Sequence, residues 1–166
     1  MGLEIKMYFV IGVFLVTLLD QVTKIWVQIN MDLMQSIPVI KGIFHLTYIH
    51  NPNSAFGLLK FPNTVFVVIG IIVILLIVFL LRKKIAQKNK LVFFSLIFIL
   101  GGSLGNMIDR LRVGSVIDFL DFRIWPIFNI ADSALNIGLF LLIIHFLFHK
   151  EDEMPEDELP EDEQEE

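Results

Sequence analysis

Four long apolar segments divide the chain, and the polar residues gather between them. The apolar segments run over Met7–Val27, Thr64–Leu81, Leu91–Met107 and roughly Ile130–Phe148. A helix needs about 20 mostly apolar residues to cross a membrane, and each segment comes close to that length. The pattern therefore predicts an integral membrane protein, mainly α-helical, with four transmembrane helices. The first segment lacks a small-residue cleavage site, so we expect a retained anchor rather than a signal peptide.

The charges of the short connections predict the orientation of these helices. The connection RKKIAQKNK, residues 82–90, contains five basic residues and no acid. Short basic loops stay on the cytoplasmic side, so we expect this connection and both termini to be cytoplasmic. Residues 28–63 and 108–129 then form two outer loops. The polar residues in or beside the helices, the basic connection excepted, gather at this outer face.

The first outer loop has the composition of a small β-sheet. SIPVI and IFHLTYI are rich in β-branched and aromatic residues, and Lys41-Gly42 between them suits a turn. Because residues 28–63 are too many for a simple connector, we expect an extracytoplasmic β-rich unit on the membrane.

Composition separates a membrane domain from an acidic tail. The chain is 55 % hydrophobic with a mean hydropathy of +0.73 and contains no cysteine. Residues 151–166 hold eleven of the eighteen acids, which leaves seven acids against thirteen bases in the remainder. We therefore expect a membrane domain over residues 1–150 and a disordered, solvated tail over residues 151–166.

Two aspartates beside the last apolar segment are candidates for chemistry. Asp118 lies among Val, Ile, Phe and Leu, and Asp132 lies at the start of the fourth predicted helix. Held close together in a partly dry site, two carboxyl groups share one proton. One can then activate a water while the other donates a proton, which is aspartic proteolysis without metal or cofactor. Asp121 between them reads as a surface or turn residue.

Other polar residues admit structural and functional interpretations. Asp20 and Lys24 have the spacing of a helical ion pair, which either neutralises itself or shapes a site. Asp109 and its basic neighbours can anchor the third helix at the headgroups, whereas Arg110 lies one turn from Asn106 and adds a second donor.

Two rival functions follow from the same residues. Clustered aspartates could hold a divalent ion in a metal-dependent lipid phosphotransferase, with Asp109, Asp118, Asp121 and Asp132 as ligands. Their spacing does not place them on one helix face. A non-enzymatic, proton-coupled membrane protein could use Asp20 as a relay, but the chain has no internal repeat.

Five motifs in order give the chain a specific resemblance. DQVTK (20–24), NPNSAFG (51–57), GGSLGNMIDR (101–110), GSVIDF (114–119) and FNIADS (128–133) together resemble the lipoprotein signal peptidase, or signal peptidase II, family. The second motif departs from the family pattern, because Asn53 and Ser54 replace a glycine and an alanine. Asn tolerates the positive φ that glycine supplies, so the turn can survive.

The resemblance implies a fold and an activity. It implies four transmembrane helices with a small extracytoplasmic β-cradle, in a bacterial cytoplasmic membrane. The implied enzyme is an aspartyl endopeptidase that cuts diacylglyceryl-modified prolipoproteins just before the lipidated cysteine, and that globomycin inhibits. The implied catalytic pair is Asp118 and Asp132, and the residues implied to line or brace the site are Asp20, Asn51, Asn106, Arg110 and Asn129. We expect a monomer in contact with membrane lipids, with no metal, cofactor or nucleic-acid partner.

Overall fold

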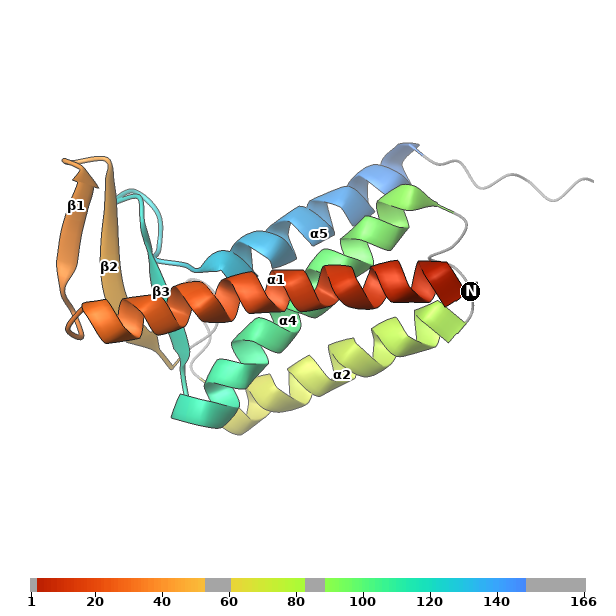
Figure 1. The fold of residues 1–166 in the computed structure, drawn as a ribbon, viewed down its shortest axis with the longest axis horizontal. Helices are drawn as coiled ribbons and strands as arrows, with labels where there is room; N and C mark the ends of the chain where they lie inside the picture. Colours follow the sequence, from red (N-terminus) through yellow and green to blue (C-terminus); the bar gives the residue numbers. More distant parts are fainter. Residues whose placement is uncertain (1–2, 53–60, 83–88, 149–166) are drawn as a thin grey trace, which may run out of the picture.

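The computed structural model of the chain describes residues 3–52, 61–82 and 89–148. Most of the basic connection, the departing motif positions Asn53 and Ser54, and the acidic tail lie outside these residues. Within these ranges, four helices form an elongated bundle, and three strands form a small sheet at one end of it (Figure 1).

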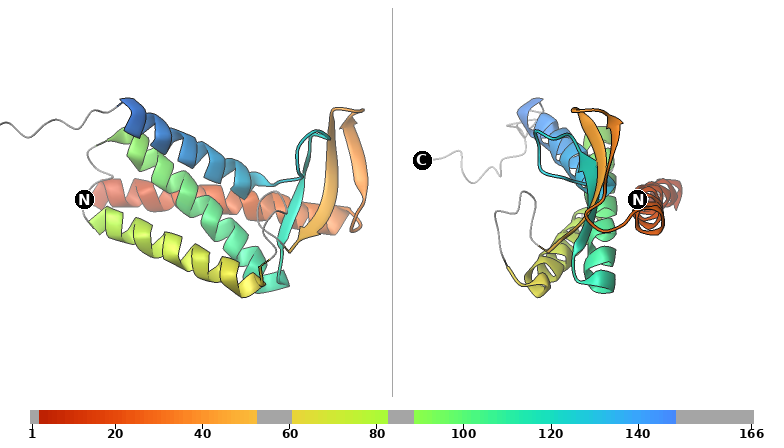
Figure 2. Two further views of the ribbon diagram at one scale, coloured as in Figure 1. Left: turned by 180° about the vertical axis from the view of Figure 1, so that it is seen from behind. Right: turned by 90° about the vertical axis from the view of Figure 1, so that its left-hand side faces the viewer.

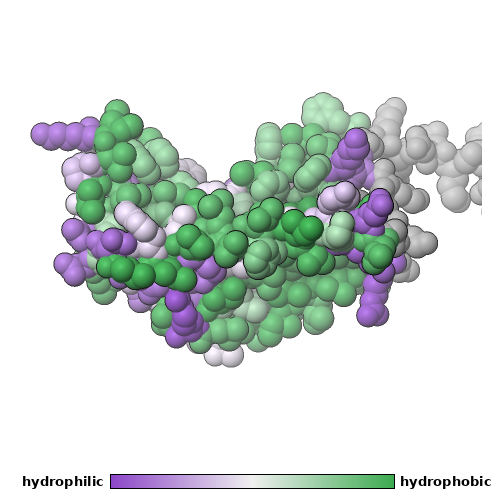
Figure 3. All heavy atoms as spheres, viewed as in Figure 1, coloured by the Kyte–Doolittle hydropathy of each residue, from purple (hydrophilic) through white to green (hydrophobic). Residues whose placement is uncertain are grey.

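The four helices are α1 (Leu3–Asn30), α2 (Asn63–Arg82), α4 (Lys90–Val113) and α5 (Ile130–Phe148). All four are long and apolar enough to cross a membrane, which confirms the predicted number of spans. Hydrophobic side chains cover the middle of the bundle, and hydrophilic ones gather toward its two ends (Figure 3). This distribution suits a hydrocarbon layer around the middle of the bundle.

Helix α4 lies at the centre of the bundle and packs against α1, α2 and α5. Glycines make this close packing possible. A Cβ on Gly101 would lie 2.7 Å from the side chain of Val16 in α1, and one on Gly102 would lie 2.5 Å from the backbone oxygen of Ala131 in α5. The GGSLG stretch therefore serves the close approach of helices, as small residues commonly do in membranes.

Both ends of α4 have sequence signals that fix them. At the first end, the side chain of Asn89 accepts a hydrogen bond of 2.7 Å from the backbone N–H of Leu91, as an N-cap does. At the other end, Gly114 has a φ of +76°, in the left-handed region. Glycine adopts this conformation without a steric cost, so the chain leaves α4 here and enters the next strand.

The sheet has the order β1–β2–β3, with β1 (Ser36–Ile40), β2 (Phe44–Asn51) and β3 (Val116–Asp121) all antiparallel. The predicted hairpin between β1 and β2 is confirmed, with Gly42 at a φ of +77° in its turn. Two views show the sheet across one end of the bundle, far from the first residues of α1 (Figure 2). In the β2–β3 register, Ile49 pairs with Asp118.

Two features of residues 108–129 were not predicted from the sequence. Helix α4 continues to Val113, so Asp109 and Arg110 lie inside it, and residues 116–121 form β3. The strand lacks the alternation of apolar and polar residues that marks a half-exposed strand, because both of its faces are largely buried. Its partner β2 comes from a distant part of the chain, so no turn motif in the sequence predicts that the two strands pair.

A hydrophobic cluster fastens the sheet to the bundle. It contains Val27 from α1, Met31 just after that helix, Tyr48 from β2, and Ile117 and Phe119 from β3. Ile117 and Phe119 alternate with Asp118, whose side chain points to the opposite face of the strand. The cluster therefore places Asp118 on the face of the sheet that looks toward α4 and α5.

Candidate active site

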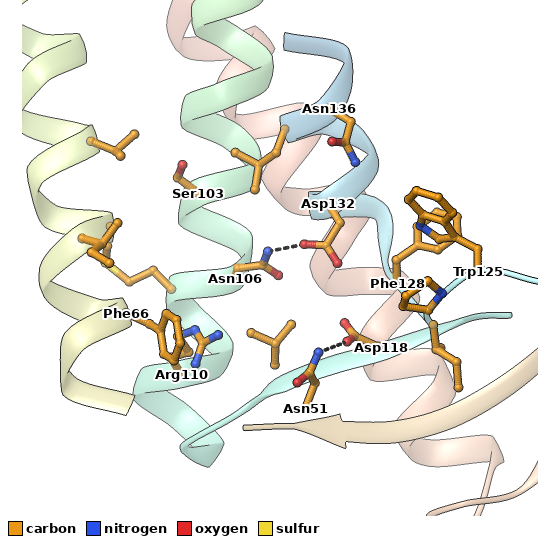
Figure 4. Close-up of a pocket in the computed structure, with 18 of the residues that line it drawn as sticks. Asn51, Phe66, Ser103, Asn106, Arg110, Asp118, Trp125, Phe128, Asp132 and Asn136 are labelled. Atoms are coloured by element: carbon orange, nitrogen blue, oxygen red, sulfur yellow. Dashed lines mark hydrogen bonds between the residues drawn. The ribbon is translucent and has the colours of Figure 1, made fainter. Parts of the chain in front are cut away.

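A groove with a volume of about 720 Å³ lies between α2, α4, α5 and the connection from β3 to α5. Its lining is mainly apolar. The polar residues in the lining are Asn51, Ser103, Asn106, Arg110, Asp118, Asp132 and Asn136. Figure 4 shows the Asp118 and Asp132 carboxylates pointing toward one another, one from the sheet and the other from the first turn of α5. The structure thus brings together the two aspartates that the sequence singled out.

Asp118 is held by two side-chain amides. Its side chain lies in the middle of β3 with 1 % of the residue exposed. The Nδ2 of Asn51 donates to Oδ2 at 2.8 Å, and the Nδ2 of Asn129 donates to Oδ1 at 2.7 Å. Each carboxylate oxygen therefore has a fixed donor, and the side chain has one orientation.

Burial has a large effect on the proton affinity of Asp118. Desolvation raises the pKa of Asp118 to about 7, and the negative charge of Asp132 acts in the same direction. The hydrogen bonds from Asn51 and Asn129 oppose this rise. Because burial dominates, Asp118 carries a proton in a large share of molecules at neutral pH.

Asp132 belongs to the N-terminal cap of α5. The backbone N–H of Asp132 donates to Oδ1 of Asn129 at 2.8 Å, and the backbone N–H of Asn129 donates to Oδ2 of Asp132 at 3.3 Å. This reciprocal pair is a capping box, here built from Asn and Asp. A carboxylate in the first turn of a helix also faces the positive end of the helix dipole. The local sequence thus fixes the position of the Asp132 side chain at the start of α5.

Asn106 and Asn129 connect the two aspartates. The Nδ2 of Asn106 donates to Oδ1 of Asp132 at 2.8 Å. The Nδ2 of Asn129 reaches both Asp118 and Oδ1 of Asn106, the latter at 3.2 Å. One continuous set of hydrogen bonds therefore joins β2, β3, α4 and α5 around the groove.

A buried ion network lies behind this set. The Nζ of Lys24 is 2.9 Å from Oδ2 of Asp20 and 2.7 Å from Oδ2 of Asp109, and all three side chains are fully buried. Lys24 also donates to Oδ1 of Asn106 at 3.0 Å. Asp20 in turn accepts a hydrogen bond of 2.8 Å from the backbone N–H of Ala131 in the first turn of α5. The predicted pairing of Asp20 with Lys24 is confirmed, and it links α1 to α4 and α5.

Arg110 lies on the α2 side of the groove. Its guanidinium carbon is 4.2 Å from the ring centroid of Phe66, a cation–π distance. Arg110 donates to Oδ1 of Asn63 at 3.2 Å, and Nδ2 of Asn63 donates to the backbone oxygen of Arg110 at 3.0 Å. Figure 4 shows Arg110 and Asn106 on the same helix, with Arg110 nearer to Phe66 than to the aspartate pair. The groove therefore has a cationic group beside its carboxyl groups.

The four aspartates do not form the cluster that the lipid phosphotransferase hypothesis needs. Asp109 is bound by Lys24, and Asp121 is not among the described residues that line the groove. Within residues 3–52, 61–82 and 89–148, no group of three or more His, Cys, Asp or Glu side chains is arranged to hold a metal ion. The geometry instead supplies one pair of carboxyl groups facing a shared space.

The burial of Asp109 and its contacts with other elements were not predicted from the sequence. We considered it an anchor at the headgroups, but the structure buries it completely against Lys24. Its Oδ2 also accepts from the backbone N–H of Ile117 in β3 at 3.2 Å. The available signal was its position three residues after Asn106, on the same face of the helix. Asn63 and Phe66, the neighbours of Arg110, had no distinguishing signal in the sequence.

Comparisons with known proteins agree with this geometry. The family model described as signal peptidase (SPase) II matches residues 12–148. The lipoprotein signal peptidase of Halothermothrix orenii is 47 % identical over 135 residues, which cover 81 % of this chain and 92 % of that protein. The lipoprotein signal peptidase of Moorella thermoacetica is 46 % identical over 137 residues, which cover 82 % of this chain and 90 % of that protein.

A solved structure has the same fold. It is described as a bacterial membrane enzyme at 2.3 Å resolution and aligns with a TM-score of 0.80 and 36 % sequence identity. The alignment covers 89 % of this chain and 94 % of the other. With a family model over most of the chain and relatives at this identity, the chain belongs to the signal peptidase II family of aspartic membrane peptidases.

Proposed function

We propose that this signal peptidase cuts diacylglyceryl-modified prolipoproteins just before the lipidated cysteine, with Asp118 and Asp132 as its catalytic pair. The observation that carries the proposal is the groove in which these two carboxyl groups face each other. An aspartic mechanism needs one protonated and one ionised carboxyl group beside the scissile bond. Two carboxyl groups that face each other in a partly dry groove share one proton in this way.

The roles of the pair follow from their environments. Asp118 holds the proton, because burial raises its pKa to about 7. We assign the ionised role to Asp132, which lies at the positive end of the α5 dipole and takes a proton from a water molecule. The water oxygen bonds to the carbonyl carbon, while Asp118 gives its proton to the carbonyl oxygen. When the C–N bond breaks, the proton held by Asp132 passes to the leaving amine. One hydroxyl of the tetrahedral intermediate returns its proton to Asp118, which leaves a carboxylic acid product and restores the pair.

The remaining polar residues have supporting roles in this proposal. Asn51 and Asn129 orient Asp118, while Asn106 orients Asp132. Asp20 braces the first turn of α5 through the backbone of Ala131. Arg110 lies close enough to the groove to bind a backbone carbonyl of the substrate. We also propose that globomycin binds in this groove and competes with the substrate.

We propose that the enzyme lies in the bacterial cytoplasmic membrane with both termini inside. The residues that border the basic connection, Arg82 at the end of α2 and Lys90 at the start of α4, lie at the end of the bundle opposite the sheet (Figures 1 and 2). The positive-inside bias makes that end cytoplasmic, which puts the sheet and the groove at the outer face. A diacylglyceryl group anchors its cysteine in the leaflet, so a scissile bond beside that cysteine lies at the depth of this groove. The membrane domain would act as a monomer, and residues 151–166 would take no part in catalysis.

The test compares detergent-purified wild type with Asp118→Asn and Asp132→Asn on a synthetic diacylglyceryl-modified substrate. Both variants should fold, because the change is nearly isosteric, and both should lose cleavage before the cysteine. Asp32→Asn is a matched control, since Asp32 is an exposed residue beyond the end of α1. Cleavage by either dyad variant at the wild-type rate would refute the assignment. Wild-type cleavage of the same peptide without its lipid at an equal rate would refute the proposed substrate class.

A further inference from the structure

The connection from β3 to α5 exposes apolar side chains to an unusual degree. Within the described residues, Ile124 is the most exposed large hydrophobic residue, at 94 %, and its neighbour Trp125 is 56 % exposed. Phe122, at the start of the connection, is 42 % exposed. We call residues 122–127 the lip. An exposed Ile and Trp in sequence, outside the helices of a membrane protein, raise the question of what covers them.

The base of the lip is held firmly. Leu120 and Phe128 form an isolated antiparallel bridge, with Leu120 N–H donating to Phe128 O at 2.8 Å and Phe128 N–H donating to Leu120 O at 3.1 Å. The rings of Phe122 and Phe128 stack with centroids 5.9 Å apart and an interplanar angle of 13°. The exposure of Ile124 is therefore built into the fold rather than a result of fraying.

Asp121 fixes the turn that follows this base. Arg123 has a φ of +64°, a left-handed conformation that residues other than glycine rarely adopt. The Arg123 backbone N–H donates to Oδ1 of Asp121 at 2.8 Å, and its Nη1 donates to Oδ2 at 3.0 Å. Thr47 on β2 donates its hydroxyl to the same Oδ2 at 2.7 Å. Asp121, which the sequence predicted to be a surface or turn residue, thus ties the lip to the sheet.

The charge on Asp121 suits this bracing role. Burial acts to raise the pKa of Asp121, but the hydrogen bonds from Thr47 and Arg123 and the charge of Arg123 outweigh it and hold the pKa below its ordinary value. Asp121 is therefore ionised at neutral pH, and its hydrogen bonds are charge-assisted.

The lip forms one wall of the groove that holds the aspartate pair. Phe122, Ile124, Trp125 and Pro126 all contribute to the lining. Figure 4 shows Trp125 beside Phe128 on the side of the groove opposite α2. One side of the lip thus lines the catalytic groove, and its other side is exposed at the surface of the protein.

A second exposed tryptophan lies toward the same end of the bundle as the lip. The chain has two tryptophans, and the other one, Trp26, is 51 % exposed near the sheet end of α1. Tryptophans concentrate at the membrane–water interface, where an apolar ring and a polar N–H are both accommodated. Arg123, whose side chain is 50 % exposed, adds a cation next to Ile124, the kind of group that lipid phosphates bind.

We propose that the lip lies in the interfacial layer of the leaflet on the sheet side, with Ile124 and Trp125 against lipid acyl chains. In this position the lip is the edge over which a lipid-anchored residue passes from the leaflet into the groove. Asp121 is a positioning residue that holds the lip at this depth. The part of the inference that concerns substrate passage rests on the proposed function, whereas the contact with lipid does not.

The first experiment tests the contact with lipid and needs no turnover. In Trp26→Phe, Trp125 is the only tryptophan, and its fluorescence can be measured in vesicles containing phospholipids brominated near the carbonyl end of the acyl chain. We expect strong quenching by these lipids and weak quenching by aqueous iodide. Trp125→Phe leaves Trp26 as the reference for a residue on a spanning helix. Strong quenching of Trp125 by iodide, or no quenching by brominated lipid, would overturn the proposal.

The second experiment tests the role of Asp121 in the reconstituted enzyme. For Asp121→Asn we expect lower fluorescence anisotropy of Trp125 in the Trp26→Phe background. We also expect KM for the lipidated substrate to rise about tenfold, which is the loss of binding expected when one charge-assisted hydrogen bond is removed. The kcat and the high-pH limb of activity should remain as in wild type, because the aspartate pair is intact. An unchanged anisotropy and KM would refute the bracing role. Equal losses in kcat and in lipid-free cleavage would show that Asp121 acts on the groove itself and not through the lip.

Discussion

The substitution Lys24→Met tests whether the buried ion network holds the groove together. Lys24 contacts Asp20 on its own helix, and Asp109 and Asn106 on α4. Met has a similar length and shape but neither charge nor donors. The substitution therefore leaves the packing volume almost unchanged and removes the cation from between two fully buried carboxylates.

The distances allow the size of the effect to be worked out. At 2.9 and 2.7 Å, each ion pair has a gross Coulomb energy of about 6 kcal/mol at an effective dielectric constant of 20. Desolvation of the charged groups offsets most of this energy in the wild type, so the net contribution is much smaller. In the variant the carboxylates remain buried without their cation, and breaking a buried pair in this way costs about 3–5 kcal/mol. For a chain of this length the unfolding midpoint should fall by roughly 6–20 °C.

The assay is thermal unfolding of the purified protein in detergent, with Lys41→Met as the matched control. Lys41 is exposed in the turn between β1 and β2, so the same chemical change there should shift the midpoint very little. The double variant Lys24→Met with Asp109→Asn keeps the net charge of the network at its wild-type value. It should recover part of the lost stability, because one unpaired carboxylate is removed.

The reasoning fails if Lys24→Met unfolds at the same temperature as Lys41→Met. Such a result would mean that the carboxylates of Asp20 and Asp109 find compensation elsewhere, by protonation or by water. A double variant less stable than Lys24→Met would also contradict the charge argument, and would indicate that Asp109 acts mainly through its hydrogen bond to Ile117.

Three further predictions follow from the groove and the helix packing. Activity should fall as pH rises through about 7, because Asp118 then loses its proton. Asn51→Ala should move this fall to higher pH, since the Asn51 hydrogen bond lowers the pKa of Asp118. A pH profile of kcat/KM for wild type and variant checks both expectations, and an unmoved profile would contradict them. The raised pKa of Asp118 also means that the folded state binds more protons than the unfolded state between about pH 4 and 7. The stability that this group contributes is therefore present below about pH 4 and lost by about pH 7. Unfolding midpoints should decline over this range in wild type and less steeply in Asp118→Asn. Gly102→Ala should destabilise the bundle by about 1–3 kcal/mol, because the new methyl would lie 2.5 Å from the backbone oxygen of Ala131; a midpoint equal to wild type would show that α4 and α5 can move apart freely.

The sequence alone was enough for the membrane architecture and the hairpin. Long apolar segments and a turn at Lys41-Gly42 are local signals, because each reflects the preference of a short stretch for hydrocarbon or for a particular backbone conformation. The aspartate pair was also predictable, since a carboxyl group among apolar residues at the start of a helix needs a compensating environment. The family resemblance added the residues that we propose to support the pair.

Tertiary structure decided the contacts between distant residues. Residues 116–121 form a strand because β2 offers an edge to pair with, and nothing near them in sequence reveals that edge. Asp109 becomes a buried partner of Lys24 because α1 and α4 pack closely at glycines. Asp121 becomes a brace because β2 brings Thr47 to it. Local preferences are properties of a short segment, whereas the charge state and role of a polar residue depend on the neighbours that folding brings within hydrogen-bond distance.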